Sequence, residues 1–169
     1  DLCVSGINHG SNASINIIYS GTMSAAMEAS IEGIHSIGFS LEDYAMDANF
    51  DPGTPWIRLI IEHVLSNGLA DSKLLNVNIP HSSLGPIRGM KICRQAEGRW
   101  EEEFVEGVDP RGQKFYWLTG NFATNDTVEG TDISALREGF ISIVPSSHDL
   151  THHRAIPALK SLESIKHIV

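Results

Sequence analysis

The sequence predicts an α/β protein in which a mostly parallel β-sheet lies between two layers of helices. Short apolar segments typical of strands alternate with helical segments through the first half of the chain, which is the pattern of a parallel sheet covered on both faces. The chain has 169 residues, of which 41% are hydrophobic and 20% are charged, as in an ordinary soluble globular protein. We therefore expect one domain with its own core.

Two helices are predicted in the first half. Apolar residues at spacings of three and four predict the first helix over residues 22–34. The second helix is marked at both ends, because Thr54 can cap it, Pro55 suits its first turn and Gly68 follows its last turn. Apolar segments between the helices predict strands that we expect to be neighbours in the sheet, at residues 2–5, 36–40 and 74–79.

The second half differs because a long hairpin interrupts it. A sequence that strongly favours a turn, Asp109-Pro110-Arg111-Gly112, lies between two strand-like segments. This pattern predicts a hairpin over residues 97–120. Shorter elements are predicted at residues 87–93 (strand), 132–138 (helix), 140–144 (strand) and 155–168 (helix). The hairpin is too thin to bury its aromatic residues, so we expect packing or oligomer contacts, more than a base-stacking platform, from Trp100, Phe104, Phe115, Tyr116 and Trp117.

Charge and composition exclude some classes of function. The formal net charge is −9, from 21 acidic and 12 basic residues, and binding to duplex nucleic acid rests on clustered Lys and Arg. No apolar run is long enough to span a bilayer, and no signal peptide is visible. We therefore expect no duplex nucleic acid and no membrane as partners.

Two further features concern the cellular context and the chain start. Cys3 and Cys93 are the only cysteines, without a CxxC or a zinc-ligand spacing, so we expect buried free thiols in a cytoplasmic protein. The residues from Asp1 to Gly6 read as the end of a buried strand that runs into a glycine turn. Since a domain rarely begins inside its own core, we expect further sequence upstream.

The loop after the first strand carries the most chemical information, because ligands of open α/β sheets bind beyond the carboxyl ends of strands. Ser20-Gly21-Thr22 begin a helix, where backbone N–H groups, the helix dipole and hydroxyl groups favour a phosphate. Asn8 and Asn12 offer amide oxygens that suit Mg²⁺, Mn²⁺ or Ca²⁺. The same residues also suit an ordinary N-cap and an Asn-rich turn, and His9 suits a solvent-facing position better than a ligand.

A second polar cluster follows the strand at residues 140–144, and it consists of His148, Asp149, His152 and His153. If that strand also ends at the ligand-binding edge, a histidine held by Asp149 could protonate a leaving alkoxide or orient water. The alternative is a solvated helix start that Asp149 or Thr151 caps.

Several sequence blocks point to one family when they are taken in order. Val4-Ser5-Gly6-Ile7-Asn8 continues with Gly10 and Asn12, and Tyr19-Ser20-Gly21-Thr22 leads into a helix with Glu28. Further blocks are His35-Ser36-Ile37-Gly38-Phe39-Ser40, Leu75-Asn76-Val77-Asn78-Ile79-Pro80, Asp109-Pro110-Arg111-Gly112 with Tyr116-Trp117, Gly130-Thr131-Asp132 and Glu138-Gly139-Phe140-Ile141-Ser142-Ile143-Val144-Pro145. Together they cover nearly the whole chain and resemble the SurE (survival protein E) family of nucleotidases.

The resemblance implies the fold, the assembly and the reaction. It implies a Rossmann-like, three-layer α/β/α SurE fold, of which residues 1–169 are the C-terminal two-thirds of a single domain. Residues 97–120 would be an oligomerisation hairpin and residues 154–169 a C-terminal helical arm, in a homodimer or a homotetramer. The implied reaction is the metal-dependent hydrolysis of nucleoside 5′- or 3′-monophosphates to nucleoside and phosphate.

The resemblance also assigns roles to residues. Asn8 would bind the divalent metal, which is Mg²⁺, Mn²⁺ or Ca²⁺. The phosphate would be bound by Gly10, Asn12, Ser20, Gly21 and Thr22, and the catalytic residues would be Asn12, Ser20, Thr22, Asp149 and His153.

The family's other metal ligands, an adjacent pair of Asp residues and a Ser, are expected upstream of Asp1. This segment alone should therefore be a poor catalyst, although its parent is an enzyme. The alternatives are a non-catalytic module that binds phosphate or a nucleotide, and an oligomerisation module.

Overall fold

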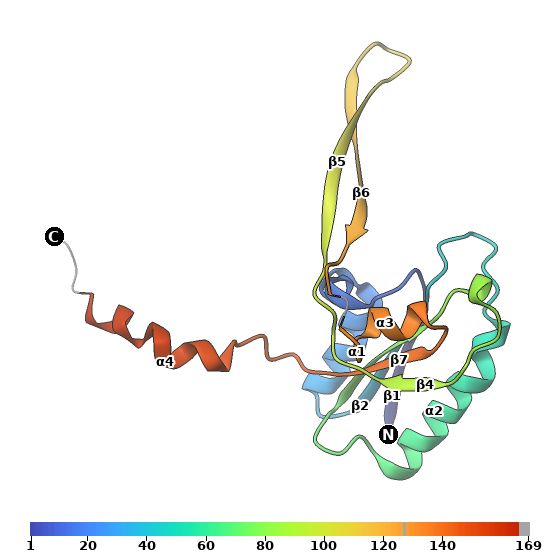
Figure 1. The fold of residues 1–169 in the computed structure, drawn as a ribbon, viewed down its shortest axis with the longest axis vertical. Coiled ribbons are helices and arrows are strands. Elements are labelled where there is room, and N and C mark those ends of the chain that lie inside the picture. The colour runs from blue at the N-terminus through green and yellow to red at the C-terminus, as the bar shows by residue number, and fades with distance from the viewer. Residues whose placement is uncertain (127, 166–169) are drawn as a thin grey trace.

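The computed structural model describes residues 1–126 and 128–165, and its body is built on a five-stranded sheet (Figure 1). The strand order is β1-β2-β3-β7-β4. The pairs β1/β2, β2/β3 and β4/β7 are parallel, and β7 is antiparallel to β3. The strands are β1 (Leu2–His9), β2 (His35–Leu41), β3 (Leu74–Ile79), β4 (Met90–Ile92) and β7 (Ile141–Ser146). The predicted mostly parallel sheet, with the first three strands as neighbours, is confirmed.

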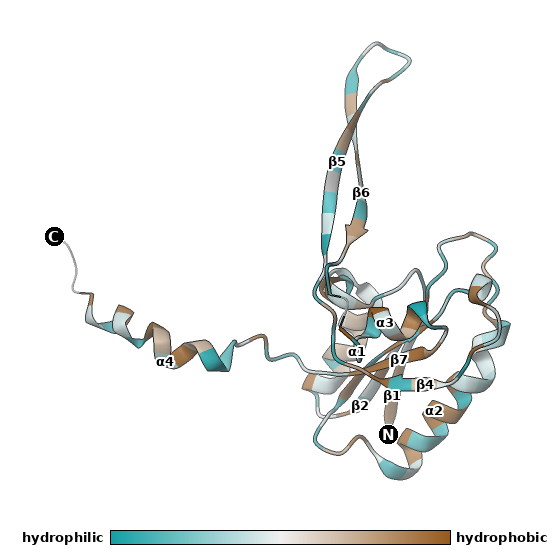
Figure 2. Cartoon of the chain, viewed as in Figure 1, coloured by the Kyte–Doolittle hydropathy of each residue, from teal (hydrophilic) through white to brown (hydrophobic). Residues whose placement is uncertain are grey.

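Helix α2 (Thr54–Asn67) covers the apolar face of the sheet. Ile60 and Val64 of the helix pack in one cluster with Phe39 of β2 and Val77 of β3, and the apolar colour of the strands is visible in Figure 2. Thr54 is the first helical residue, and Gly53, which has no side chain, occupies the N-cap position. The prediction that Thr54 caps this helix is therefore wrong, although its boundaries are confirmed.

Helix α1 (Gly21–Ile31) lies on the opposite face of the sheet and contacts β1, β2 and β3. The sheet presents small residues there, and a Cβ atom added to Gly38 would lie 2.3 Å from the sulfur of Met23. Glycine is therefore needed at this position for α1 to pack so closely. Helix α3 (Asp132–Arg137) packs against β7. Helices on both faces give the expected α/β/α layers.

The predicted hairpin is confirmed as a long two-stranded ribbon of β5 (Arg99–Val108) and β6 (Lys114–Ala123) that projects from the body (Figure 1). Apolar and polar segments follow each other along it (Figure 2). Its exposed aromatic residues include Phe104, Tyr116 and Trp117. A ribbon of this kind has little local core of its own.

The C-terminal segment leaves the body as an arm (Figure 1). The predicted helix over residues 155–168 is interrupted, with α4 (Ile156–Leu159) between 3₁₀ turns at His153–Ala155 and Lys160–Ser164, while residues 166–168 lie outside the described part. None of these turns buries a residue, and a short helix without tertiary contacts is marginal. Within the described residues, no helix combines the length and apolar composition that crossing a bilayer requires.

Candidate active site

The candidate site lies where β1, β2 and β3 end together. Because the three strands are parallel, the residues that follow them meet at one edge of the sheet. Strand β1 extends to His9 rather than ending near Ser5, and the following loop contains a 3₁₀ turn, Ser14–Tyr19, that leads into α1. The loop therefore lies at the ligand-binding edge that the sequence predicts for it.

Asn8 has an amide group whose orientation is fixed by the backbone. Its Nδ2 donates to the carbonyl oxygens of His9 at 2.8 Å and Gly10 at 2.9 Å. Since only the amino side of an amide can donate to a carbonyl, Oδ1 is the atom that faces the first turn of α1. The hydroxyl of Thr22 donates to Oδ1 at 3.3 Å. The amide oxygen that the sequence predicts as a metal ligand and the hydroxyl that it predicts to bind phosphate therefore meet at this point.

Ser20 is the N-cap of α1, and its Oγ accepts a hydrogen bond from the N–H of Met23 at 3.0 Å. The side chain is nearly buried, with 7% of the residue exposed. The capping interpretation of Ser20 is therefore observed, and its hydroxyl proton stays available for donation. Gly21 has no atom within 4 Å of where a Cβ would lie, so the helix start is open to an approaching anion.

Asn12 belongs to a buried polar network that the sequence did not predict. Its Nδ2 donates to Ser40 Oγ at 2.7 Å, and its backbone N–H donates to Asn78 Oδ1 at 2.7 Å. Asn76 Nδ2 donates to the Asn12 carbonyl at 2.8 Å, and Asn78 Nδ2 donates to Asn76 Oδ1 at 3.0 Å. These bonds fix the loop to β2 and β3, and they leave Oδ1 and the second Nδ2 proton as the groups that the Asn12 side chain could offer a ligand.

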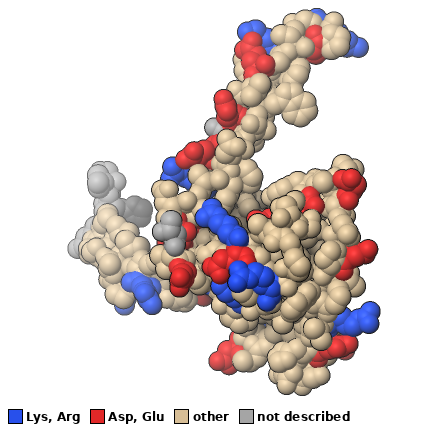
Figure 3. Space-filling view, turned by 45° about the vertical axis from the view of Figure 1, so that its right-hand side comes forward, with Lys and Arg blue, Asp and Glu red and all other residues tan. Residues whose placement is uncertain are grey.

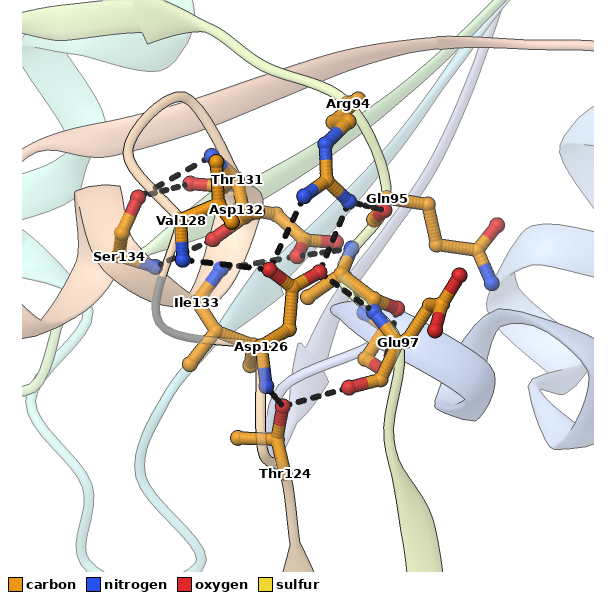
Figure 4. Close-up of polar contacts among 12 residues, drawn as sticks. Arg94, Gln95, Glu97, Thr124, Asp126, Val128, Thr131, Asp132, Ile133 and Ser134 are labelled. Carbon is orange, nitrogen blue, oxygen red and sulfur yellow. Dashed lines mark hydrogen bonds and ion pairs between the residues drawn. The ribbon is translucent and has the colours of Figure 1, made fainter.

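Asp132, at the start of α3, fixes the other side of the loop (Figure 4). Its carboxylate is fully buried and accepts hydrogen bonds from the N–H groups of Ser14 at 2.8 Å, Ala96 at 2.9 Å and Ile133 at 2.8 Å. Ser14 is two residues after Asn12, and Ala96 precedes the hairpin. One carboxylate therefore holds together the candidate loop, the hairpin base and α3.

Arg94 and Asp126 form a second polar link at the hairpin base (Figure 4). Two hydrogen bonds of 2.8 and 2.9 Å join the guanidinium to the carboxylate, and this contact, with the Glu97 N–H, lowers the pKa of Asp126 to about 2. A hollow of about 590 Å³ lies around this pair. The pair neutralises its own charge, so this hollow is a poorer phosphate site than the start of α1. On the face shown in Figure 3, basic side chains lie singly or beside acidic ones.

Two acidic residues, Glu42 and Asp43, follow β2 at the same edge of the sheet, and the sequence analysis assigns neither of them a role. The Asp43 carbonyl accepts the Gly10 N–H at 2.9 Å, and its carboxylate lies 3.7 Å from His81. Burial raises the pKa of Glu42, and a hydrogen bond from the His81 backbone opposes the rise. The signal that could have found them is their position directly after a buried strand.

The described residues do not form a complete metal site. No group of three or more His, Cys, Asp or Glu side chains among them could hold a metal ion. Asn8 supplies one neutral oxygen, and divalent cations of this kind normally need carboxylates as well. Asn8 therefore fits one ligand position of such an ion and does not complete a site by itself.

The cluster of Asp149 and His153 does not reach this edge. Since β7 is antiparallel to β3, Ser146 at its end lies beside Leu74 at the beginning of β3. The expectation that this strand also ends at the ligand-binding edge is therefore wrong. His153 Nε2 and Asp149 Oδ2 form a pair of their own at 2.7 Å. Hydrogen bonds from Thr151 and His153 lower the pKa of Asp149.

His148 lies at the same distant edge, beside Lys73 and Ser146. His152 is the residue before the first turn of the arm and is exposed. His9 is also exposed, and its Nδ1 lies 3.1 Å from the Ala45 carbonyl. The free thiols differ in exposure, since Cys93 is buried and Cys3 is half-buried.

Comparison with known proteins places these features in one family. A family model described as Survival protein SurE matches residues 1–102. A 5′-nucleotidase SurE of Christiangramia forsetii is 56% identical over 161 residues, which are 95% of this chain and 62% of that protein. A 5′-nucleotidase SurE of Flavobacterium psychrophilum is 55% identical over 161 residues, with 95% and 63% covered. The chain thus spans about three fifths of the length of these curated relatives.

A solved structure shares the fold. The crystal structure of the SurE protein from Aquifex aeolicus superposes with a TM-score of 0.78 at 37% sequence identity. The superposition covers 97% of this chain and 66% of that one. The arrangement of the sheet and its helices is therefore common to both proteins.

Proposed function

Because the chain belongs to the SurE family, we propose that the protein hydrolyses nucleoside monophosphates to nucleoside and phosphate with the help of a divalent metal. The observation that carries this proposal is the contact between Asn8 and Thr22, whose side-chain oxygens lie 3.3 Å apart at the open start of α1. Further support comes from the curated relatives, which are named 5′-nucleotidases.

In the proposed complex, the phosphate lies at the start of α1. Gly21 and Thr22 are the first two residues of the helix, so their N–H groups have no acceptor in a preceding turn. To bind the phosphate, the Thr22 hydroxyl turns its proton from Asn8 Oδ1 toward a phosphate oxygen, and the Ser20 hydroxyl donates from the same end. Gly10 lies at the rim, and the second Nδ2 proton of Asn12 is a further donor. The helix dipole adds to the attraction. These groups orient the phosphate and stabilise the charge that develops on it.

We propose Asn8 as one ligand of Mg²⁺, Mn²⁺ or Ca²⁺, completed by carboxylates from the part of the protein that this chain does not span. When bound, such an ion neutralises phosphate charge and lowers the pKa of a bound water molecule. The role of Asn8 is to hold its oxygen toward the phosphate, and its two backbone hydrogen bonds supply that orientation.

The assembly is part of the proposal. The projecting hairpin and the arm expose apolar side chains that include Trp117 and Leu159, which supports a homodimer or homotetramer formed through these elements. Asp149 and His153 can then act only at a site to which the arm of another copy brings them. The two unbridged cysteines are compatible with the cytoplasmic location that we propose.

The test measures phosphate release from nucleoside 5′- and 3′-monophosphates by a protein of the relatives' full length. We expect release with Mg²⁺ or Mn²⁺, and loss of release when a chelator is added. Nucleotide binding by equilibrium dialysis, without any hydrolysis under these conditions, would support the non-catalytic binding module instead.

A further inference from the structure

The candidate site continues into an aromatic hollow at the hairpin base. A hollow of about 200 Å³ beside the loop is lined by Asn8, Asn12, Tyr19 and Trp100, among others. A second hollow of about 480 Å³ is lined by Tyr19 and Trp100 together with Leu118, Thr119 and Gly120 of β6. The two hollows therefore share Tyr19 and Trp100 as a common wall. Asn8 lines the smaller hollow, and residues of β6 line the larger one.

Trp100 is held in its orientation by one polar and one apolar contact. Its Nε1 donates to Asn16 Oδ1 at 2.8 Å. Its ring meets Phe122 edge to face, with centroids 5.8 Å apart and an angle of 72°. The residue is still 39% exposed. Since both polar and apolar contacts are satisfied, its remaining ring surface is available to a ligand with little further loss of side-chain freedom.

The pleat of the hairpin separates Trp100 from Trp117. Trp100 pairs with Phe122, and Phe104 pairs with Leu118, whereas Trp117 pairs with Val105. Because successive side chains point to opposite faces, Trp100 and Leu118 lie on the face that lines the hollow, and Trp117 lies on the other face. The two tryptophans of the hairpin therefore lie on different faces, and Trp100 packs against Phe122 beside the hollow.

We propose that Tyr19 and Trp100 form the subsite that binds the base of the nucleotide. This inference rests on the proposed function, because it places the phosphate at Asn8 and Thr22. Tyr19 is 71% exposed and immediately precedes Ser20, the cap of the phosphate-binding helix. Asn8 connects the two positions, because it contacts Thr22 of that helix and also lines the hollow beside Trp100. Stacking on an aromatic ring recognises the π-face of any base, so this subsite distinguishes nucleotides from phosphates that lack a base.

The experiment compares two substrates in the full-length protein with Mn²⁺ present. Adenosine 5′-monophosphate carries a base, and ribose 5-phosphate lacks one. We expect Trp100→Leu to lower kcat/KM for the nucleotide by about tenfold or more, which is the usual cost of one lost stacking contact, and to leave ribose 5-phosphate unchanged. Trp100→Phe should retain most of the preference. Trp117→Leu is the matched control, and it should leave the ratio of the two substrates unchanged.

The variant Tyr19→Ala tests the same subsite in case Trp100→Leu fails to fold. Tyr19→Ala changes an exposed side chain, and it should lower the same ratio in a protein that folds normally. If Trp100→Leu and Tyr19→Ala each changed kcat/KM for the nucleotide and for ribose 5-phosphate by the same factor, the base subsite would be overturned. The proposed function would remain intact.

A binding measurement separates the two claims. Equilibrium dialysis with adenosine needs no hydrolysis, and we expect wild type to bind it and Trp100→Leu to bind it at least about tenfold more weakly. Absence of phosphate release with intact adenosine binding would reject the nucleotidase proposal alone. Equal adenosine binding by wild type and Trp100→Leu would reject the subsite.

Discussion

The hydroxyl of Thr22 lies 3.3 Å from the amide oxygen of Asn8, and this contact joins the first turn of α1 to the end of β1. Asn8 is held in the correct orientation by two backbone carbonyls, and Thr22 is positioned by the capped helix start. If Asn8 binds a metal and Thr22 binds phosphate, as we propose, the Thr22 hydroxyl only has to rotate its proton away from Asn8 Oδ1. Such preorganisation is what a phosphate-transfer site requires.

The Thr22 hydroxyl is expected to act on the substrate and not on the fold. Thr22→Val keeps the shape but removes the donor, so kcat/KM for a nucleoside monophosphate should fall by about 100-fold, as for the loss of one transition-state donor. Thr22→Ser keeps the donor and should retain most of the activity. Steady-state kinetics of both variants test this. Equal activity of Thr22→Val and wild type would show that the hydroxyl only contacts Asn8.

Asp132 is expected to position the loop through its hydrogen bond with Ser14, without contacting the substrate itself. In Asp132→Asn, the amide oxygen can still accept from Ala96 and Ile133, but its NH₂ group then faces the N–H of Ser14. We expect the free energy of unfolding to fall by about 2 kcal/mol, the usual loss for a hydrogen bond to a charged group. The amide of Ser14 should exchange hydrogen faster, and KM should rise more than kcat falls.

Asp126→Asn is the control for Asp132. It disturbs the neighbouring ion pair with Arg94 but has no contact with Ser14 among its hydrogen bonds. Its effect on Ser14 exchange should be small. Equal exchange rates at Ser14 in both variants would contradict the positioning role of Asp132.

The sequence was sufficient to predict the layers and the position of the loop, because both depend on local patterns. Strand and helix periodicity marked β2, α2 and β3, and parallel strands with intervening helices leave few possible topologies. It was not sufficient for the network around Asn12. Asn76 and Asn78 read as one face of an alternating strand, and their partner Asn12 lies 64 and 66 residues away in the chain.

Strand direction was the second feature that the sequence could not supply. The apolar segment of β7 predicts a strand but carries no information about its orientation. Only the antiparallel pairing with β3 shows that Asp149 and His153 follow the strand out of the opposite edge. Glu42 is a different case: its position directly after β2 can be read from the sequence, whereas its burial depends on contacts that form only in the folded chain.

Glu42 is expected to make stability depend on pH. Burial raises its pKa in the folded state above the ordinary value of 4.5, so the folded protein binds this proton more tightly than the unfolded chain. The contribution to stability is present below pH 4.5 and is lost as the pH rises through the folded-state pKa. Glu42→Gln cannot lose a proton, so its stability relative to wild type should increase from pH 4 to pH 8.

Urea unfolding of both proteins across this pH range measures the difference. A difference between Glu42→Gln and wild type that stays constant with pH would contradict the raised pKa of Glu42. The comparison is informative because the substitution preserves the size of the side chain.

The hairpin is expected to hold copies of the chain together. Phe104 and Trp117 are 66% and 65% exposed in a single chain, and a partner surface would remove them from water. Replacing both by Ser should lower the mass measured by light scattering. A wild-type protein that is monomeric, or a variant with unchanged mass, would contradict this role.

The metal dependence of Asn8→Ala tests the central claim most directly. Phosphate release from adenosine 5′-monophosphate is measured while Mn²⁺ is titrated into wild type, Asn8→Ala and Ser20→Ala. We predict that Asn8→Ala needs at least about tenfold more Mn²⁺, since the loss of even an outer-shell partner costs that much, and that excess metal restores part of its rate. Ser20→Ala should keep the wild-type metal requirement and lose activity toward the substrate. A wild-type Mn²⁺ requirement in Asn8→Ala, or full wild-type activity with a chelator present, would contradict the assignment of Asn8 as a metal ligand.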